Sequence, residues 1–428
     1  MHSATHDTIA AVWRIESARI VAAVARMLRD IGQAEEVAQD ALVAALEHWP
    51  REGLPDKPGA WLMTTAKHRA LDLLRRHKVQ GEVLDQVGLD LEAQEALVVP
   101  DISEGIDARR ADAIGDDMLR LIFTACHPVL VPEQRAALTL KLIAGLSTHE
   151  IARAFLVSEA TLAQRIVRAK RTLSEARVPY ELPRGAALGE RLASVLEVVY
   201  LVFNEGYTAT AGEDWMRPAL VEEALRLGRM LAALAPGEPE VQGLQALMEL
   251  QASRMAARTD AQGRPVLLLD QNRAQWDHLL IRRGLEALLR AEALCAQQGE
   301  ALGPYALQAA IAACHARAHE AAQTDWVRIA ALYEALAQTT PSPVVELNRA
   351  VAVAMAYGPA AGLAILDTLR DEKALQAYQW LPSVRGDLLS KLGRHAEARA
   401  EFERAAALTQ NQRERELLLA RAQASGLD

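Results

Sequence analysis

Residues 147–173, with the sequence STHEIARAFLVSEATLAQRIVRAKRTL, constrain the fold of this chain more than any other stretch. Ser147 and Glu150 have the spacing of a capping box, in which each side chain satisfies a backbone N–H at the start of a helix. After a short interruption, Ser158 is placed to cap a second helix that begins with the acidic Glu159. The cations of this second helix are Arg165, Arg168, Lys170 and Arg171. This pattern predicts a helix-turn-helix that reads the major groove of DNA.

The composition of the chain favours a protein built from helices. Of its 428 residues, 51% are hydrophobic and only 4% are aromatic, and Ala and Leu dominate over the residues typical of strands. A chain of this length is expected to form roughly two to four domains. The formal net charge of −9 excludes a uniformly basic nucleic-acid coat, so any DNA binding requires local basic faces.

Cysteine usage and the N-terminal sequence indicate a cytoplasmic protein. The three cysteines, Cys126, Cys295 and Cys314, are odd in number and far apart, as in a reducing compartment. The N-terminus has no basic segment followed by an apolar core, so no signal peptide is expected. No apolar stretch is long enough to predict a membrane span.

Two helical blocks precede a long C-terminal part. The first block, residues 9–78, contains a loop rich in Gly and Pro over 53–59, and Pro50 is expected to end the helix before it. Its helices are expected over 14–28, 34–49 and 61–76. The second block, residues 112–178, ends in the helix-turn-helix. Residues 79–111 are acidic with weak periodicity and predict a linker.

The last helix of the first block forms a second basic cluster. Its cations are Lys67, Arg69, Arg75, Arg76 and Lys78, beside His68 and His77. Trp49 and Trp61 precede them, and aromatic rings near a basic helix can stack on an unpaired base or enter a base step. The alternative is that both rings anchor the core and that the cations form a solvated face.

An acidic face precedes this basic helix. Its residues, at helical spacings, are Glu35, Glu36, Gln39 and Asp40. Acidic groups close to a DNA-binding surface repel phosphate, so a partner protein with a basic surface explains them better than DNA does. A solvated helix face is the alternative.

The two motifs occur in an order in which residues 9–178 resemble RNA polymerase sigma factors of the extracytoplasmic-function type. The segment IGQAEEVAQDALVAALEHW, followed by PGAWLMTTAKHRALDLLRR, is similar to their region 2. The segment PEQRAALTLKLIAGLSTHEIARAFLVSEATLAQRIVRAKRTL is similar to their region 4. The remainder looks like the subgroup with a long tetratricopeptide-like C-terminal extension. The resemblance implies binding to core RNA polymerase, through its β′ clamp helices and β flap, and to promoter DNA.

The resemblance also implies roles for individual residues. The residues that match the face held by the β′ clamp helices are Glu35, Glu36, Gln39 and Asp40. Those that match the segment melting and reading the −10 element are Trp61, Lys67, His68, Arg69, Arg75 and Arg76. The residues on the helix that matches the −35-binding helix of the family are Thr161, Gln164, Arg165, Arg168 and Lys170. By edge geometry, Gln164 suits adenine and Arg165 suits guanine.

At two positions the chain departs from the family pattern. His68 stands where these sigma factors commonly have Asn. Leu156 stands where many such turns carry Gly, and Leu adopts a positive φ with difficulty, so a turn without glycine geometry is expected.

The C-terminal part is expected to be helical throughout, as a middle domain over 187–290 and repeats over 291–428. The positions that fit a tetratricopeptide repeat are Gly386, Leu389, Gly393, Ala398, Phe402 and Ala405. An earlier copy is suggested by Ile329, Tyr333, Leu336 and Pro341, with a degenerate copy around Gly358 between them. A plain array of helical hairpins is the alternative.

Polar residues in the middle domain suggest either an ion-pair network or a sensing pocket. They are Asn204, Glu205, Arg254, Arg258, Asp270, Arg273 and Asp277. A network that locks the domain is the favoured interpretation, and a small-ligand or partner site is the alternative. The spacing of His315 and His319 lacks enough further ligands to predict a metal site, and no glycine-rich phosphate loop is present. No cofactor is therefore expected.

Three classes of function remain open at this point. A sigma factor with a fused regulatory or polymerase-binding extension explains both basic helices and the acidic face. A helix-turn-helix regulator with a helical-repeat sensor would not need the basic helix of the first block. An enzyme with a DNA-targeting module needs a catalytic constellation that the sequence does not contain. The first class is therefore the prediction, with no catalytic activity of its own.

Overall fold

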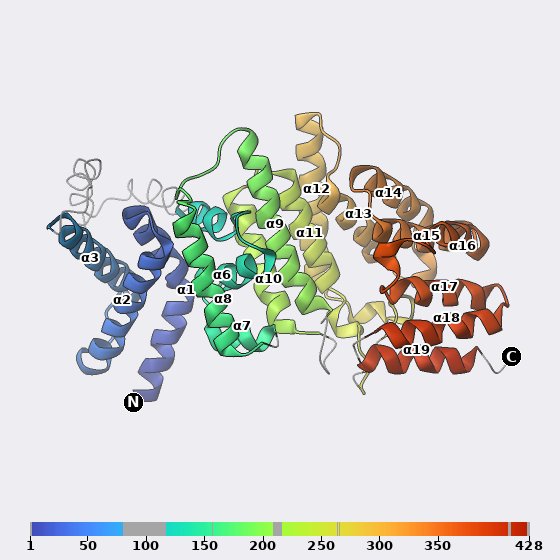
Figure 1. Ribbon diagram of the computed structural model, residues 1–428, viewed down its shortest axis with the longest axis horizontal. Coiled ribbons are helices and arrows are strands. Elements are labelled where there is room, and N and C mark those ends of the chain that lie inside the picture. The colour runs from blue at the N-terminus through green and yellow to red at the C-terminus, as the bar shows by residue number, and fades with distance from the viewer. Residues whose placement is uncertain are drawn as a thin grey trace. The chain divides into compact units, whose positions relative to one another are not determined.

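The computed structural model describes residues 2–79, 117–155, 157–208, 216–262, 264, 266–409 and 412–425. These residues form helices joined by turns and loops, which confirms the all-α prediction (Figure 1). They divide into two compact units, Met1–Val199 and Tyr200–Asp428. Apart from residue 79, the predicted linker lies outside the described residues. No described helix is both long and apolar enough to cross a membrane.

The first block is a bundle of three helices, α1 (His2–Leu28), α2 (Ile31–Glu52) and α3 (Pro58–Val79), packed against one another. Its core contains fully buried side chains such as Ile20 and Leu62. Asp30 begins α2, because its carboxylate accepts a hydrogen bond of 2.9 Å from the backbone N–H of Gln33.

The helix α2 does not end at Pro50, so that prediction is wrong. It continues to Glu52, and Gly53 follows with a φ of 92° and a backbone N–H that bonds to the Trp49 carbonyl. Pro50 cannot donate to the carbonyl of Leu46 four residues earlier, but that is the loss of one hydrogen bond in a helix of 22 residues, and the last turn still closes. Pro58, expected in a loop, instead begins α3, at the position where a helix tolerates proline best.

The second block contains a helix over the described residues 117–125 and then three more. These are α6 (Pro132–Leu142), α7 (Thr148–Ala154) and α8 (Glu159–Glu175). The capping box is confirmed: the Ser147 N–H donates to Glu150 at 2.7 Å, and the Glu150 N–H donates to Ser147 Oγ at 3.1 Å. Ser158 likewise accepts from the Thr161 N–H and caps α8. Leu156, where a turn without glycine is expected, lies outside the described residues.

The first half of α9 (Ala186–Tyr207) belongs to the same compact unit as these two blocks. Arg135 of α6 donates to Ser194 Oγ at 2.5 Å and to Glu197 at 2.9 Å. Ser194 in turn donates to the carbonyl of Cys126 at 2.6 Å. These bonds, of which the two through Ser194 are buried, extend the N-terminal unit beyond residue 178, the expected end of the second block.

The C-terminal unit is a succession of helices, each packed on the next, and α17, α18 and α19 lie side by side in the red part of Figure 1. Its helices after α9 are α10 (Pro218–Leu234), α11 (Pro239–Ala252), α12 (His278–Gln298), α13 (Pro304–Arg317), α14 (Trp326–Thr339), α15 (Pro343–Tyr357), α16 (Pro359–Thr368), α17 (Trp380–Lys391), α18 (His395–Leu408) and α19 (Gln412–Ala424).

The pair α17–α18 contains the strongest repeat-like positions. Leu389, Ala398, Phe402 and Ala405 are buried there. A Cβ on Gly386 would lie 2.9 Å from the Phe402 ring, so this close approach requires glycine. Gly393, between the helices, has a φ of 72°. The helix pair is therefore present, and its assignment to tetratricopeptide-like repeats stays a prediction.

Candidate nucleic-acid and polymerase interface

The helix α8 presents a polar face to solvent. Thr161, Gln164 and Arg168 are exposed, and Arg165 is half-buried. The opposite face is apolar and buried, through Leu162, Ile166, Ala169 and Leu173. An exposed row of hydrogen-bonding side chains on a helix anchored by its other face has the geometry needed to enter a major groove.

Lys170 does not belong to that exposed row. It forms an ion pair with Glu35 of α2, and the two side chains are only 24% and 10% exposed. Lys141 of α6 lies on the other oxygen of the same carboxylate, at 4.0 Å. The structure therefore brings together one residue predicted to bind DNA and one predicted to bind polymerase.

The acidic face of α2 is split by this contact. Glu36 and Asp40 are exposed, Gln39 is half-buried, and Glu35 is buried against the second block. Asp40 lies 3.3 Å from Arg69 of α3, which belongs to the predicted −10 set. Glu36 and Asp40 are thus the accessible part of the predicted polymerase-binding face.

The basic helix α3 presents His68, Arg75 and Arg76 to solvent, whereas Lys67 and Arg69 are half-buried. Trp61 is half-buried as well, and its ring packs edge-on against Trp49 with 5.4 Å between the centroids. Trp49 is 3% exposed, which makes it a core residue. Trp61 is therefore the more accessible of the two rings to an unpaired base.

The sequence gives no signal for the hydrogen bonds of Tyr180, which link the two blocks of the N-terminal unit. The Tyr180 hydroxyl, which follows α8, donates to the carbonyls of Ala22 in α1 and Asp117 at 3.0 and 3.1 Å. Burial raises the pKa of this phenol, so it stays protonated and continues to donate. Tyr180 and Ala22 lie too far apart in the chain for any local pattern to predict the contact.

Two arginines of the middle-domain polar set bind carbonyl groups of the backbone. Arg258 donates to the Tyr207 carbonyl and stacks on the Tyr207 ring, 3.7 Å from its centroid. Arg273 donates to the carbonyls of His315 and Ala318, both at 2.7 Å. Carbonyl oxygens and aromatic rings satisfy these guanidinium groups, because helix ends leave carbonyls without partners.

The acidic members of that set have separate tasks. Asp277 caps α12 by accepting from the N–H groups of Leu279 and Leu280 at 2.8 and 3.0 Å. Glu205 pairs with Arg217, outside the set, and Asp270 is exposed. Within the described part of the chain, no group of three or more His, Cys, Asp or Glu side chains is arranged to hold a metal ion.

Comparisons with known proteins agree with this geometry. The family model Sigma-70 region 2 matches residues 14–79, and Sigma-70, region 4 matches residues 120–173. A third model, a family of unknown function named DUF6596, matches residues 191–292. The two sigma models fall in the expected order on the two blocks that carry the acidic face, the basic helix and the helix-turn-helix.

Relatives extend the likeness over most of the chain. "Uncharacterized protein R00370" of Rhizobium meliloti is 44% identical over 390 residues, which cover 91% of this chain and 89% of the relative. "Probable ECF RNA polymerase sigma factor SigI" of Mycobacterium tuberculosis is 29% identical over 40% of this chain and 57% of its own length. "ECF RNA polymerase sigma factor SigK" of Mycobacterium ulcerans is 29% identical over 39% of this chain and 84% of its own length. No solved structure matches the chain.

These findings define a sigma factor, a class of non-enzymatic protein that binds core RNA polymerase and promoter DNA to direct transcription initiation. "ECF RNA polymerase sigma factor SigK" of Mycobacterium bovis is 30% identical over 36% of this chain and 78% of its own length. The chain therefore belongs to the extracytoplasmic-function type of sigma factor, and it carries a long C-terminal extension that includes the DUF6596 region.

Proposed function

We propose that the three polar surfaces of the N-terminal unit divide the work of promoter recognition. The face of α2 that contains Glu35, Glu36, Gln39 and Asp40 binds the β′ clamp helices. The basic helix α3 captures the melted −10 element through Trp61, Lys67, His68, Arg69, Arg75 and Arg76. The helix α8 reads the −35 duplex through Thr161, Gln164, Arg165 and Arg168, joined by Lys170 once its ion pair with Glu35 opens, and the second block also contacts the β flap.

The observation that carries this proposal is the exposure of these surfaces on separate helices. Glu36 and Asp40 on α2 are open to a basic protein surface, while Gln164 and Arg168 on α8 are open to base edges. DNA and polymerase therefore approach different helices. The chain works in the cytoplasm with the polymerase and has no catalytic activity of its own, because the polymerase makes the RNA.

Co-purification with core RNA polymerase and run-off transcription test this division of roles. Glu36→Lys with Asp40→Lys is expected to reduce polymerase binding by about tenfold or more, because like charges then face a basic partner. The control is Glu403→Lys, an exposed acid of α18 in the C-terminal unit. If the α2 variant binds polymerase as well as the control does, the clamp assignment is wrong.

The domains we propose are region 2 over 9–78, a linker over 79–111, region 4 over 112–178, a middle domain over 187–290 and repeats over 291–428. The extension regulates the sigma part or helps to hold the polymerase, through a partner protein or a small ligand. A fused domain acts at high effective concentration, so even a weak contact is effective.

The role of the extension is tested by run-off transcription with the full chain and with a chain that ends at Val199. This end point retains Ser194 and Glu197, the partners of the buried Arg135. Unequal transcription from two equally stable chains is the expected result. Equal transcription would remove the regulatory role.

A further inference from the structure

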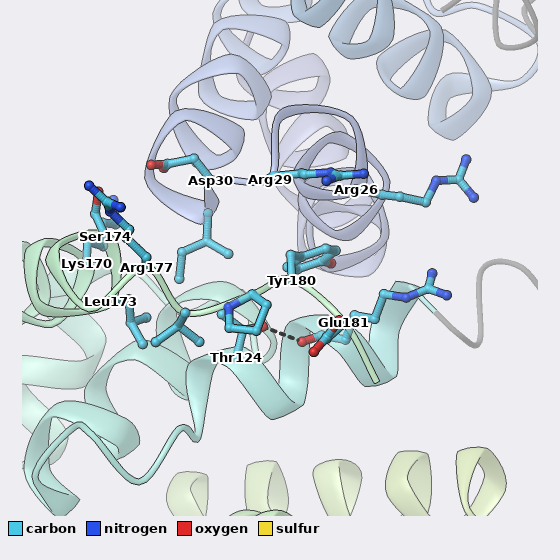
Figure 2. Close-up of a pocket in the computed structure, with 14 residues that line it drawn as sticks. Arg26, Arg29, Asp30, Thr124, Lys170, Leu173, Ser174, Arg177, Tyr180 and Glu181 are labelled. Carbon is cyan, nitrogen blue, oxygen red and sulfur yellow. Dashed lines mark hydrogen bonds between the residues drawn. The ribbon is translucent and has the colours of Figure 1, made fainter. Parts of the chain in front are cut away.

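A basic cavity of about 720 Å³ lies between the C-terminal ends of α1 and α8. Its size is that of a small-molecule site. Figure 2 shows the side chains that line it, with Arg26 in α1, Arg29 just after α1, Lys170 in α8 and Arg177 just after α8. The cationic side chains in its lining are Arg26, Arg29, Arg120, Lys170 and Arg177, and the acidic ones are Asp30 and Glu181. The surplus of cations is notable in a chain whose net charge is −9.

Arg29 and Arg177 have an unusual backbone conformation. Their φ angles are 54° and 47°, and among the described residues no other non-glycine residue has a positive φ. A left-handed backbone is unfavourable for a residue with a Cβ, and glycine is the usual residue just after a helix. Strained non-glycine residues gather at binding sites, where the side chain is needed in spite of the backbone. Here both strained residues are arginines that line one cavity.

The two strained arginines also differ from the other cations in their partners. Arg26 and Arg120 share the carboxylate of Asp117 at 3.4 and 2.7 Å, and Lys170 pairs with Glu35. No carboxylate of the described residues forms an ion pair with Arg29 or Arg177, and both are exposed. A helix dipole favours a cation at these positions, but it leaves both guanidinium groups open to an anion.

The two acids of the lining offset only part of the charge of its five cations, so the lining keeps a net positive charge. Asp30 accepts a hydrogen bond of 2.9 Å from the N–H of Gln33 at the start of α2, which holds its carboxylate at that helix end. Glu181 is the remaining acid of the lining, and it is exposed. Duplex DNA is a poorer occupant than a small anion. The face of α8 that is open to a duplex bears Gln164 and Arg168, whereas Lys170 in the cavity lining lies on a different side of the helix and is turned toward α2.

We propose that this cavity binds a small anion with two or more phosphate groups, a linear polyphosphate or a nucleoside polyphosphate, between Arg29 and Arg177. A guanidinium group binds phosphate oxygens in a bidentate manner, and two arginines that follow separate helices favour a ligand with more than one phosphate. Because Arg29 follows the first block's α1 and Arg177 follows the second block's α8, the bound anion stabilises the arrangement in which these blocks are packed together.

The test is isothermal titration calorimetry of the full chain with sodium tripolyphosphate and, separately, with ATP, in buffer of physiological ionic strength. It needs neither polymerase nor DNA, so its failure is distinct from failure of the proposed function. Arg29→Asn with Arg177→Asn removes both charges while keeping a residue that accepts a left-handed backbone. We expect the affinity for tripolyphosphate to fall about tenfold or more in this double variant.

The matched control is Arg171→Gln, an exposed arginine of α8 that pairs with Glu175 and does not line the cavity. It is expected to change the affinity less than twofold, roughly the effect of one screened distant charge. Arg29→Lys with Arg177→Lys should restore part of the binding. Tighter binding of ATP than of tripolyphosphate assigns the site to a nucleotide, and equal binding assigns it to the phosphate chain.

Two results would overturn the proposal. One is the absence of binding of either probe to the unmodified chain at millimolar concentration. Another is an equal loss of affinity in the double variant and in Arg171→Gln, which indicates general charge screening. Melting curves without ligand verify that the double variant is folded.

Discussion

Glu35 of α2 and Lys170 of α8 form an ion pair that joins the two blocks of the N-terminal unit. Lys141 lies beside the same carboxylate, so Glu35 faces two ammonium groups from the second block. The proposed function assigns Glu35 to polymerase and Lys170 to DNA. Each residue is therefore occupied by the other in this arrangement, and binding of polymerase through Glu35 requires the pair to open.

The first prediction follows from this competition. Lys170→Gln weakens the contact between the blocks, and we expect affinity for core polymerase to rise by about two- to tenfold, the effect of biasing a two-state equilibrium by roughly 1 kcal/mol. Fluorescence anisotropy of the labelled full chain with core polymerase measures it. Arg171→Gln, one residue along the same helix, should leave the affinity unchanged. A fall in affinity with Lys170→Gln would contradict the competition.

The second prediction concerns the contact between α1 and the loop after α6. Gly145 has a φ of 70°, and a Cβ there would lie 3.1 Å from Ser17 Oγ. We expect Gly145→Ala to lower the free energy of unfolding by about 2 kcal/mol, of which about 1 kcal/mol comes from backbone strain. Urea denaturation of the full chain measures this free energy.

Gly185 provides the matched control for that prediction. Its φ is 57°, and a Cβ there would meet nothing within 4 Å. Gly185→Ala should therefore lower the free energy of unfolding only by the cost of the strained backbone. Ser17→Ala, added to Gly145→Ala, should recover part of the free energy of unfolding that Gly145→Ala loses. If both glycine variants lose the same free energy of unfolding, the contact with Ser17 contributes nothing to the effect of Gly145→Ala.

The third prediction is a pH dependence of stability in the C-terminal unit. Burial, aided by Arg254 and Arg273, lowers the pKa of His315 from 6.5 to about 3. Below the higher of these values the unfolded chain takes up a proton that the folded chain does not, so stability falls as the pH falls. Between pH 7 and pH 5 we expect His315 to account for a loss of about 2 kcal/mol.

Chemical denaturation at a series of pH values measures this contribution. The ring of His315 packs edge-on against Trp326, with 5.2 Å between the centroids, so tryptophan fluorescence is a suitable probe. His315→Gln should flatten the dependence, whereas His278→Gln, at an exposed histidine, should preserve it. An unchanged slope in His315→Gln would mean that this imidazole is protonated in the folded state.

The fourth prediction concerns the reading of the −35 duplex. Gln164→Ala and Arg168→Ala should each weaken binding to the cognate duplex by about 1–3 kcal/mol if the side chain contacts a base. Both side chains are exposed, so the melting temperature should not change. Electrophoretic mobility shifts with matched and scrambled duplexes measure the effect. Equal weakening on both duplexes would assign these residues to phosphates rather than bases.

Local features of the fold were accessible from the sequence because their partners are close in the chain. Ser147 and Glu150 are three residues apart, and the hydrogen bonds between them follow from that spacing. Ser158 caps α8 for the same reason. Pro50 shows the limit of such rules, since a proline costs one hydrogen bond to the preceding turn and the rest of the helix can outweigh that loss.

Contacts between distant segments were not accessible in the same way. The acidic residues of α2 share a helix side in the sequence, but only the packing of the second block reveals that Glu35 is buried and that Glu36 is exposed. Arg135 and Ser194 are 59 residues apart, and nothing local to either predicts their bond. The strained backbone of Arg29 and Arg177 likewise has no sequence signal, because glycine is the expected residue at such positions.

Promoter-dependent transcription tests the central claim most directly. The full chain is added to core RNA polymerase that lacks other sigma factors, genomic fragments serve as templates, and the 5′ ends of the transcripts are mapped. We predict transcripts with discrete starts that share −10 and −35 elements and that disappear with Gln164→Ala plus Arg168→Ala. Co-purification without any such transcript, or starts that do not depend on the added chain, would contradict the account.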